Sequence, residues 1–377
     1  MQKKAYPMKI LVPIIGFGAA GGYRVLSELA NHWQDAGHIV DFLVDSRSPD
    51  PYFPTRVGII RFETTGRILP AGSEPSEVRF VGSGNAYSIY YGMWRALQRI
   101  GHNYDVILAN HSLTTFPVSL ARTGAARKFY YVQAYEPEYY ALEKGIKSRV
   151  LQLLARASYT LPLVQIANAP IYIDHPAIHA AKWIPPGVDQ GVFYRRSSPP
   201  VFLPNEPWTI GVIGRHEPAK GTRYALEAFV ELARTDPYVR LKVAFGNLPD
   251  GWRHERAEVV IPRNDAELAD YYRSVDVLLA PGTVQLGAVH YPVLESMACG
   301  TPVITTGYLP ANRENTWIVP IHDSRSIVEA ARNIYRMPNE QLKSKLDDAN
   351  SAISAFFWPV VAQEFLDAFN STNKPCR

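Results

Sequence analysis

Short apolar segments alternate with longer amphipathic segments along the first half of the chain. Residues 20–36 and 86–101 carry apolar side chains at helical spacing, and runs of strand length surround them. These runs are residues 9–15 (KILVPII), 38–44 (HIVDFLV), 57–62 (VGIIRF), 105–110 (DVILAN), 128–134 (KFYYVQA) and 163–168 (LVQIAN). Strands that alternate with helices form parallel sheets covered by helices, so the pattern predicts an α/β domain.

The same alternation restarts after a proline-rich segment. Residues 185–207 contain six prolines without apolar periodicity, which is typical of an interdomain linker. Strand-like runs follow at residues 208–214, 240–246, 276–281 and 301–306, and helical patterns at 222–234, 265–275 and from 291. We therefore expect an α/β chain with two Rossmann-like, doubly wound parallel sheets: residues 1–190, a linker at 191–207, and residues 208–355.

Composition and charge exclude several classes of protein. The chain has 377 residues, and its formal net charge of +4 is too small to suggest a nucleic-acid partner. Cys299 and Cys376 are the only cysteines, without disulfide or metal-site spacing, which fits a reducing compartment. We find neither a signal peptide nor an apolar run of roughly 18 residues, the minimum for a spanning helix. These features favour a cytoplasmic protein.

A glycine pattern near the start raises a first hypothesis about function. Gly16, Gly18 and Gly21 form G-x-G-x-x-G between a predicted strand and a predicted helix, and Asp41 and Asp45 follow. This arrangement is typical of dinucleotide-binding domains and would suggest a dehydrogenase. A dehydrogenase usually pairs one such domain with a different substrate domain, whereas this chain has two similar halves. The second half therefore argues against this hypothesis.

The loop after residue 213 contains two basic residues suited to an anion. In residues 213–229 (IGRHEPAKGTRYALEAF), Arg215 and Lys220 flank a short loop, and Gly221 allows a turn into a helix. An arginine fork and a lysine ammonium both suit a diphosphate, and a helix N-terminus is itself an anion site. Two solvated basic residues on a surface loop are the alternative.

Residues 276–307 (DVLLAPGTVQLGAVHYPVLESMACGTPVITTG) make the interpretation specific. Glu295 lies near the start of a predicted helix, where its carboxylate can accept both hydroxyls of a ribose. The motifs GRHEPAKG, LLAPG and YPVLESMACGTPVITT together resemble the donor-binding domain of retaining GT-B glycosyltransferases of family 4 (glycosyl transferases group 1). Residues 184–193 and 356–369 resemble the segment before the family's linker and its closing helix, so the resemblance spans nearly the whole chain.

The resemblance implies a GT-B fold, two Rossmann-like domains facing a cleft, with a C-terminal helix at 356–372 crossing back onto the first domain. It implies that Arg215 and Lys220 bind the diphosphate of a nucleotide sugar and that Glu295 binds its ribose. Gly21 and Gly22 would leave room for the donor sugar or its β-phosphate. The implied donor-binding residues are Gly21, Gly22, Gly214, Arg215, Lys220, His290, Tyr291, Val293, Leu294 and Glu295.

The chain departs from the family at one position. The family has two glutamates separated by seven residues; the second is Glu295, but Gly287 occupies the position of the first. That glutamate contacts donor-sugar hydroxyls in the family, so the identity of the donor sugar stays open. Gln285 and His290 are candidates to replace it. We expect His290 to reach the site, although a structural histidine is the alternative.

Residues 127–145 (RKFYYVQAYEPEYYALEKG) predict the acceptor side. A strand ending near Gln133 places that residue at the carboxyl edge of the sheet, where such sheets carry their sites. Glu136 is a candidate general base or acceptor ligand, and we take Gln133 and Glu136, with Arg215 and Lys220, as the candidate catalytic residues. The candidate acceptor-binding residues are Tyr135, Glu138, Tyr139 and His111. An aromatic core beside a solvated acidic turn is the alternative. The Q-x-Y-E-P pattern resembles a subset that builds rhamnose-containing and other surface polysaccharides.

Residues 141–157 mix basic and apolar residues at helical spacing, including Lys144, Lys147, Arg149 and Arg156. Such a helix can lie on the inner face of an anionic membrane, or it can pack on the sheet with its basic face in water. The chain contains neither D-x-D nor H-E-x-x-H. By resemblance, Arg, Lys and helix dipoles hold the diphosphate, so we expect no metal and no cofactor beyond the nucleotide-sugar substrate.

The sequence therefore predicts a retaining glycosyltransferase that moves a hexosyl or deoxyhexosyl group to a glycan or lipid-linked glycan acceptor in surface polysaccharide or glycoconjugate biosynthesis. Two alternatives use the same architecture. A sugar-nucleotide epimerase would bind the same donor without an acceptor surface, and the tyrosine-rich stretch argues against it. A non-catalytic nucleotide-sugar-binding protein would fit the absence of a glutamate at Gly287.

Overall fold

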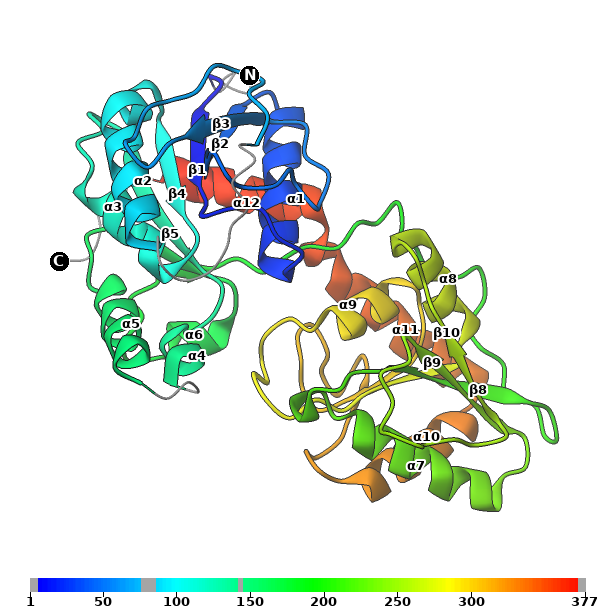
Figure 1. Cartoon of the computed structure of the whole chain (residues 1–377). Coiled ribbons are helices and arrows are strands. Elements are labelled where there is room, and N and C mark those ends of the chain that lie inside the picture. Colours follow the sequence, from blue (N-terminus) through cyan, green and yellow to red (C-terminus); the bar gives the residue numbers. More distant parts are fainter. Residues whose placement is uncertain (1–5, 76–85, 142–144, 372–377) are drawn as a thin grey trace. The chain divides into compact units, whose positions relative to one another are not determined.

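The computed structural model describes residues 6–75, 86–141 and 145–371, and its chain forms two compact units (Figure 1). The first unit comprises residues 1–186 and 358–377, and the second comprises residues 187–357. Lys144, one of the basic residues named above, and Cys376 lie outside the described residues.

A seven-stranded sheet forms the centre of the first unit. Its order is β3-β2-β1-β4-β5-β6-β7, and every neighbouring pair is parallel. The strands are β1 (Lys9–Pro13), β2 (Ile39–Asp45), β3 (Gly58–Phe62), β4 (Val106–Ala109), β5 (Arg127–Val132), β6 (Val164–Ala167) and β7 (Lys182–Trp183). Strands buried on both faces read as continuous apolar runs, which is why β1, β4 and β5 are apparent in the sequence.

Helices cover both faces of this sheet. They are α1 (Gly21–Asp35), α2 (Ala86–Ile100), α3 (Thr115–Leu120), α4 (Pro137–Ala141), α5 (Ile146–Ser158), α6 (Pro170–Ile173) and α12 (Trp358–Asn370). The last of these follows the whole second unit in the sequence, yet it lies beside α1 (Figure 1). The Trp33 ring contacts Phe365 and Phe369 at centroid distances of 5.7 and 5.4 Å, and its Nε1 donates to the Ala362 carbonyl at 3.1 Å. Aromatic packing thus anchors the C-terminal helix in the first unit.

The second unit repeats the design with six parallel strands in the order β10-β9-β8-β11-β12-β13. Its strands are β8 (Trp208–Ile213), β9 (Val239–Ala244), β10 (Ala257–Val260), β11 (Val277–Ala280), β12 (Val303–Thr305) and β13 (Trp317–Ile318). Its helices are α7 (Thr222–Thr235), α8 (Asp265–Ser274), α9 (Tyr291–Ala298), α10 (Ser324–Tyr335) and α11 (Asn339–Ile353).

The proline-rich segment predicted as a linker lies on the second unit. Phe193 is buried beside Tyr272, and the Phe202 ring packs against Trp208 and Tyr335. Residues 191–207 therefore contribute to the core of this unit, and the chain passes between units at residues 186–187 and 357–358.

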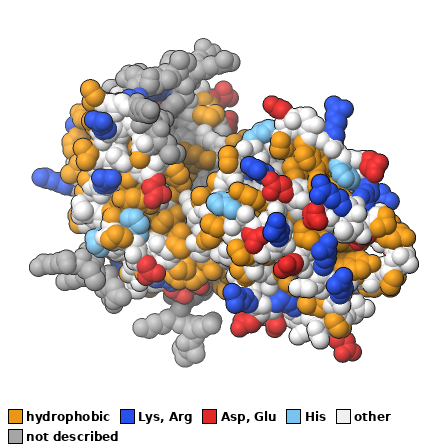
Figure 2. Space-filling model, turned by 90° about the horizontal axis from the view of Figure 1, so that it is seen from below, with side chains coloured by type: hydrophobic (Ala, Val, Ile, Leu, Met, Phe, Trp, Pro, Cys, Tyr) orange, Lys and Arg blue, Asp and Glu red, His pale blue; other side chains and the backbone are white. Residues whose placement is uncertain are grey.

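The surface gives no sign of a single-sign charge distribution on the face drawn in Figure 2. Lys and Arg side chains are interspersed there with Asp and Glu, and hydrophobic side chains lie between them. Among the helices that the structure describes, none combines the length and the apolar character needed to cross a bilayer.

Candidate functional site

The second unit positions Arg215 and Lys220 on the loop between β8 and α7. Gly221 has a φ of 74°, and a Cβ there would come within 2.0 Å of the Pro281 carbonyl oxygen, so only glycine fits this turn. The Arg215 backbone N–H donates to the Thr222 hydroxyl at 3.1 Å, which ties the start of the loop to the first residue of α7. This turn sets Lys220 immediately before the N-terminus of a helix.

The two cations lie close together, and Glu217 is an acidic neighbour of Lys220. Burial, and then the charge of Arg215, lower the pKa of Lys220. The Arg215 guanidinium lies 5.9 Å from the centre of the Phe245 ring, and within the described part of the chain neither cation forms an ion pair. Two neighbouring positive charges at a helix N-terminus form a binding site for an anion such as a diphosphate.

Helix α9 contributes a buried carboxylate. Glu295 is only 2% exposed, and the Tyr272 hydroxyl donates to its Oε2 at 3.0 Å. Burial and this neighbouring carboxylate raise the pKa of Tyr272, which keeps the phenol protonated as a donor. Val293 and Leu294 are fully buried in the core, so only their backbone could contact a ligand. His290 occupies the N-cap position of α9, with Tyr291 at its first residue.

The loop before α9 has an unusual backbone. Gln285 and Gly287 have φ values of 55° and 84°, and the Gly287 N–H donates to the Gly307 carbonyl at 2.9 Å. Residues with side chains rarely adopt such angles, so the backbone at 287 favours glycine over the glutamate of the family pattern. Gln285 is exposed.

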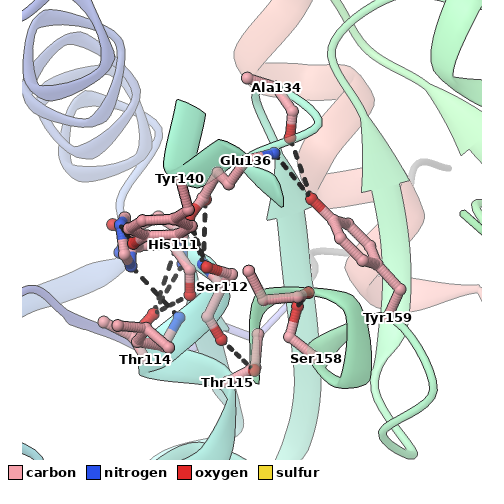
Figure 3. A network of polar contacts seen from close by, with 12 residues as sticks. His111, Ser112, Thr114, Thr115, Ala134, Glu136, Tyr140, Ser158 and Tyr159 are labelled. Atoms are coloured by element: carbon pink, nitrogen blue, oxygen red, sulfur yellow. Dashed lines mark hydrogen bonds and ion pairs between the residues drawn. The ribbon is translucent and has the colours of Figure 1, made fainter. Parts of the chain in front are cut away.

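The first unit gathers a second group of polar residues where β4 and β5 end (Figure 3). The Glu136 carboxylate accepts the Ser112 backbone N–H at 2.9 Å and the Ser112 hydroxyl at 2.5 Å. His111 Nε2 lies 3.1 Å from Glu136 Oε2 and 3.5 Å from the Tyr140 hydroxyl. The Glu136 backbone N–H donates to the Tyr159 hydroxyl, which donates to the Ala134 carbonyl. Glu136 thereby joins the two loops.

The ring of His111 has a defined tautomer. Its Nδ1 accepts the Leu113 backbone N–H at 3.2 Å, so in the neutral ring the proton lies on Nε2, which faces Glu136. Both nitrogens of this histidine are thus occupied by contacts within the protein.

Gln133, Gly21 and Gly22 are brought together at the start of α1. A Cβ on Gly22 would lie 3.2 Å from Gln133 Oε1, whereas a Cβ on Gly21 would meet no atom within 4 Å. Helix α1 begins without a side-chain cap, and the Tyr23 N–H donates to the Ala20 carbonyl at 2.9 Å.

The remaining acceptor candidates differ in exposure. Tyr135 is packed between the rings of Tyr159 and His175, at 5.5 and 4.0 Å, whereas Glu138 and Tyr139 are exposed. The sequence interpretation missed Tyr23 and Tyr90: burial and the nearby Glu136 raise the pKa of both. Tyr23 directly follows Gly22, and that adjacency could have indicated it.

The two acids of the dinucleotide hypothesis have structural partners. Asp41 accepts the Tyr104 hydroxyl at 2.8 Å from the middle of β2, and buried Asp45 binds Arg47 at 2.7 Å. The Phe17 N–H donates to the Ser48 hydroxyl, which fixes the glycine loop. Within the described ranges, no group of three His, Cys, Asp or Glu side chains could hold a metal ion.

Known proteins match part of this chain in sequence, and the match to a family lies in the second unit. Residues 207–337 match the model of the family described as "Glycosyl transferases group 1". The chain is 26% identical over 207 residues to the D-inositol 3-phosphate glycosyltransferase of Corynebacterium glutamicum, a match that covers 49% of this chain and 48% of that protein. The chain thus spans about half the length of this curated relative.

Solved structures match nearly the whole chain at low identity. HepE of Anabaena, solved with UDP and glucose, aligns with a TM-score of 0.66 and 17% identity, covering 97% of this chain and 100% of that one. WaaG, a glycosyltransferase involved in lipopolysaccharide biosynthesis, aligns with a TM-score of 0.63 and 15% identity, covering 96% of this chain and 100% of that one. A putative UDP-N-acetylglucosamine 2-epimerase of Listeria monocytogenes aligns with a TM-score of 0.56 and 10% identity, covering 98% of this chain and 99% of that one. The predicted GT-B fold, with its two parallel-sheet α/β domains, is confirmed.

Proposed function

We propose that this chain is a retaining glycosyltransferase that moves a hexosyl or deoxyhexosyl group from a nucleoside-diphosphate sugar to a glycan or lipid-linked glycan in surface polysaccharide or glycoconjugate biosynthesis. The observation that carries the proposal is the pair of cations Arg215 and Lys220, which lie next to each other before a helix N-terminus and form no ion pair in the described structure. This pair falls within the residues that match the family of group 1 glycosyl transferases.

The proposed reaction breaks the bond between the anomeric carbon of the sugar and the β-phosphate oxygen. Negative charge then develops on the leaving diphosphate, where Arg215 and Lys220 stabilise it. Removing one such donor typically costs ~2.7–4 kcal/mol of transition-state stabilisation. In a retaining mechanism the acceptor hydroxyl attacks the same face, and its proton passes to the β-phosphate oxygen. This route requires no protein base.

The contacts of Glu136 fit a positioning role in the first unit. Its oxygens already accept bonds from Ser112 and lie against His111, so it could take a proton from an acceptor only by giving up one of these contacts. We assign Glu136 to hold the loops after β4 and β5, with Gln133 beside the start of α1. Exposed Tyr139 offers an aromatic face to an acceptor sugar.

We further propose that α5 contacts an anionic membrane surface. Ile146, Val150 and Leu153 are 82%, 40% and 63% exposed and lie on one helical stripe, while small residues such as Ser148 and Ala155 face inward. Lys147, Arg149 and Arg156 are also exposed. An apolar stripe flanked by basic residues suits an anionic lipid surface, which would place the enzyme in the cytoplasm at the inner face of the membrane.

Vesicle sedimentation tests this contact. We expect wild type to bind vesicles containing phosphatidylglycerol and not vesicles of phosphatidylcholine alone, and Leu153→Glu to abolish binding. Exposed Leu203 of the second unit supplies the control Leu203→Glu. Equal sedimentation of Leu153→Glu and wild type would contradict the proposal.

Product formation separates the proposed function from its alternatives. Purified protein is incubated with UDP-, GDP-, ADP- and dTDP-sugars, each with and without a glycan acceptor, and the products are resolved by mass spectrometry. Transfer only with acceptor supports the glycosyltransferase, isomerised donor without acceptor supports an epimerase, and binding without conversion supports a non-catalytic protein.

Activity should persist in EDTA, because Arg215 and Lys220 neutralise the diphosphate; loss of activity in EDTA and its recovery with Mn²⁺ would reject that expectation.

A further inference from the structure

His290 carries a ring nitrogen that the protein leaves unused. Its Nδ1 is shielded from solvent and has no hydrogen-bond partner, although part of the residue remains accessible. A buried polar atom without a partner costs stability unless a ligand or a water molecule forms a hydrogen bond with it. This histidine occupies the N-cap of α9, yet its side chain caps no backbone N–H of the helix.

The surroundings hold the ring in place and keep it neutral. The His290 ring packs on Tyr308 at a centroid distance of 4.6 Å, and the Tyr308 hydroxyl donates to the Val284 carbonyl at 2.7 Å. Burial, followed by the charges of Lys220 and Arg215, lowers the pKa of His290 to about 3. The ring therefore offers a fixed, uncharged hydrogen-bonding nitrogen beside the two cations.

The backbone nearby explains why an imidazole would be needed there. Gly287 occupies the position where the family pattern has a sugar-contacting glutamate, and its φ of 84° disfavours any side chain. A neutral imidazole can form a hydrogen bond to a hydroxyl without adding negative charge beside a diphosphate. Arg215 and Lys220 already provide the donors that a diphosphate needs, which leaves the sugar as the partner for Nδ1.

On the basis of the proposed function, we propose that His290 Nδ1 hydrogen-bonds a hydroxyl group of the donor sugar and determines how the sugar is recognised. His290 is then a specificity residue for the sugar and contributes little to binding of the nucleoside diphosphate alone.

Calorimetric titration with matched ligand pairs tests this assignment. The pairs are UDP and UDP-glucose, GDP and GDP-mannose, and ADP and ADP-glucose, and the pair that wild type binds most tightly is used. His290→Phe keeps an aromatic ring for Tyr308 but removes both nitrogens, whereas His290→Asn keeps a polar group near the site of Nδ1. His254 supplies the control His254→Phe, because its ring also packs on an aromatic residue, Phe229, but lies before the edge strand β10, three strands away from β11, which precedes His290.

We expect His290→Phe to weaken binding of the nucleotide sugar about fivefold, the equivalent of one hydrogen bond, and to leave the nucleoside diphosphate unchanged. His290→Asn should recover part of the loss, and the control should match wild type. Wild-type binding of both ligands by His290→Phe, or equal weakening of both, would overturn the sugar contact while leaving the donor site intact. If wild type binds none of these ligand pairs, the proposed function itself is contradicted. That outcome is measured on wild type alone, so it is distinct from any result obtained with the His290 variants.

Discussion

The two units contain the same kind of sheet, but the polar cluster around Glu136 in the first unit and the one around Arg215 and Lys220 in the second differ in how their groups are paired. In the first unit Glu136 is surrounded by donors from Ser112 and His111, and both nitrogens of His111 are occupied. In the second unit Arg215 and Lys220 form no ion pair within the described residues, and His290 Nδ1 lacks a hydrogen-bond partner. Polar groups that form hydrogen bonds with one another hold a structure rigid. Polar or charged groups on a loop that have no such partner can instead bind a ligand. The contrast supports the proposal that a nucleotide binds to the second unit.

The strongest way to break this comparison is to remove the two cations. We expect Arg215→Ala or Lys220→Ala to lower turnover by about 10²–10³-fold, because each removes charge that stabilises the leaving diphosphate. The affinity of these variants for the nucleoside diphosphate, measured by calorimetry, should also fall. Arg223 gives a matched control, since it lies on the first turn of α7 but is exposed and paired with Glu227 at 2.7 Å. Equal nucleotide affinity of wild type and of a variant that carries both Arg215→Ala and Lys220→Ala would show that the diphosphate binds elsewhere.

Removing the buried carboxylate of the second unit should have the next largest effect. Glu295→Ala leaves the Tyr272 hydroxyl without its acceptor in the core, so we expect a loss of about 1–3 kcal/mol of stability together with loss of nucleotide binding. A thermal-shift panel of UDP, GDP, dTDP, CDP, NAD and NADP measures both. A ligand at 100 times its dissociation constant adds about 2.7 kcal/mol to wild type.

The variant Tyr272→Phe separates the two effects of this change. It removes the same hydrogen bond but keeps the carboxylate, so it should lose stability and still respond to the nucleoside diphosphate. A full ligand response by Glu295→Ala would contradict the ribose assignment, and a response of wild type to NAD or NADP alone would revive the dinucleotide hypothesis.

The sequence predicted the sheets and the second-unit motifs because both are local patterns. The apolar runs of β1, β4, β5, β8 and β11 are continuous, and the residues from Arg215 to Gly221 lie on one loop. Strands of two residues, such as β7 and β13, are too short to show periodicity, and residues 191–207 gave no sign that Phe193 and Phe202 pack into a core.

The first-unit cluster was only partly predictable for a different reason. His111 and Glu136 could be selected as candidates, but their contact joins residues separated by 25 positions, and no local pattern encodes it. Tyr23 and Tyr90 come from two further helices and approach Glu136 only in the fold. The lowered pKa of His290 likewise depends on its burial in the fold and then on the charges of Lys220 and Arg215, which are distant in the sequence.

Glu136→Gln sharpens the comparison from the side of the first unit. The amide turns one acceptor oxygen into a donor that faces Ser112 or His111, so we expect a loss of about 1–3 kcal/mol in the free energy of unfolding. Nucleotide affinity should not change, while the KM for the acceptor should rise as the loops after β4 and β5 loosen. Exposed Glu138 provides the control Glu138→Gln. A fall in nucleotide affinity without loss of stability would mean that Glu136 itself contacts the donor.

The smallest expected effect is a pH dependence that His290 contributes to the second unit. Its pKa falls from 6.5 to about 3 in the folded chain, where it faces Lys220, Arg215 and the Tyr308 ring. Between these values the unfolded chain binds the proton and the folded chain does not, so stability is lost as the pH falls below 6.5. From pH 6.5 to 5 the loss can reach ~2 kcal/mol. Urea unfolding at both pH values should show a weaker pH dependence for His290→Phe than for wild type. The other titrating groups are common to both proteins and cancel in the difference, so equal pH dependence would mean that His290 is accessible to protons and does not keep a neutral nitrogen for the sugar.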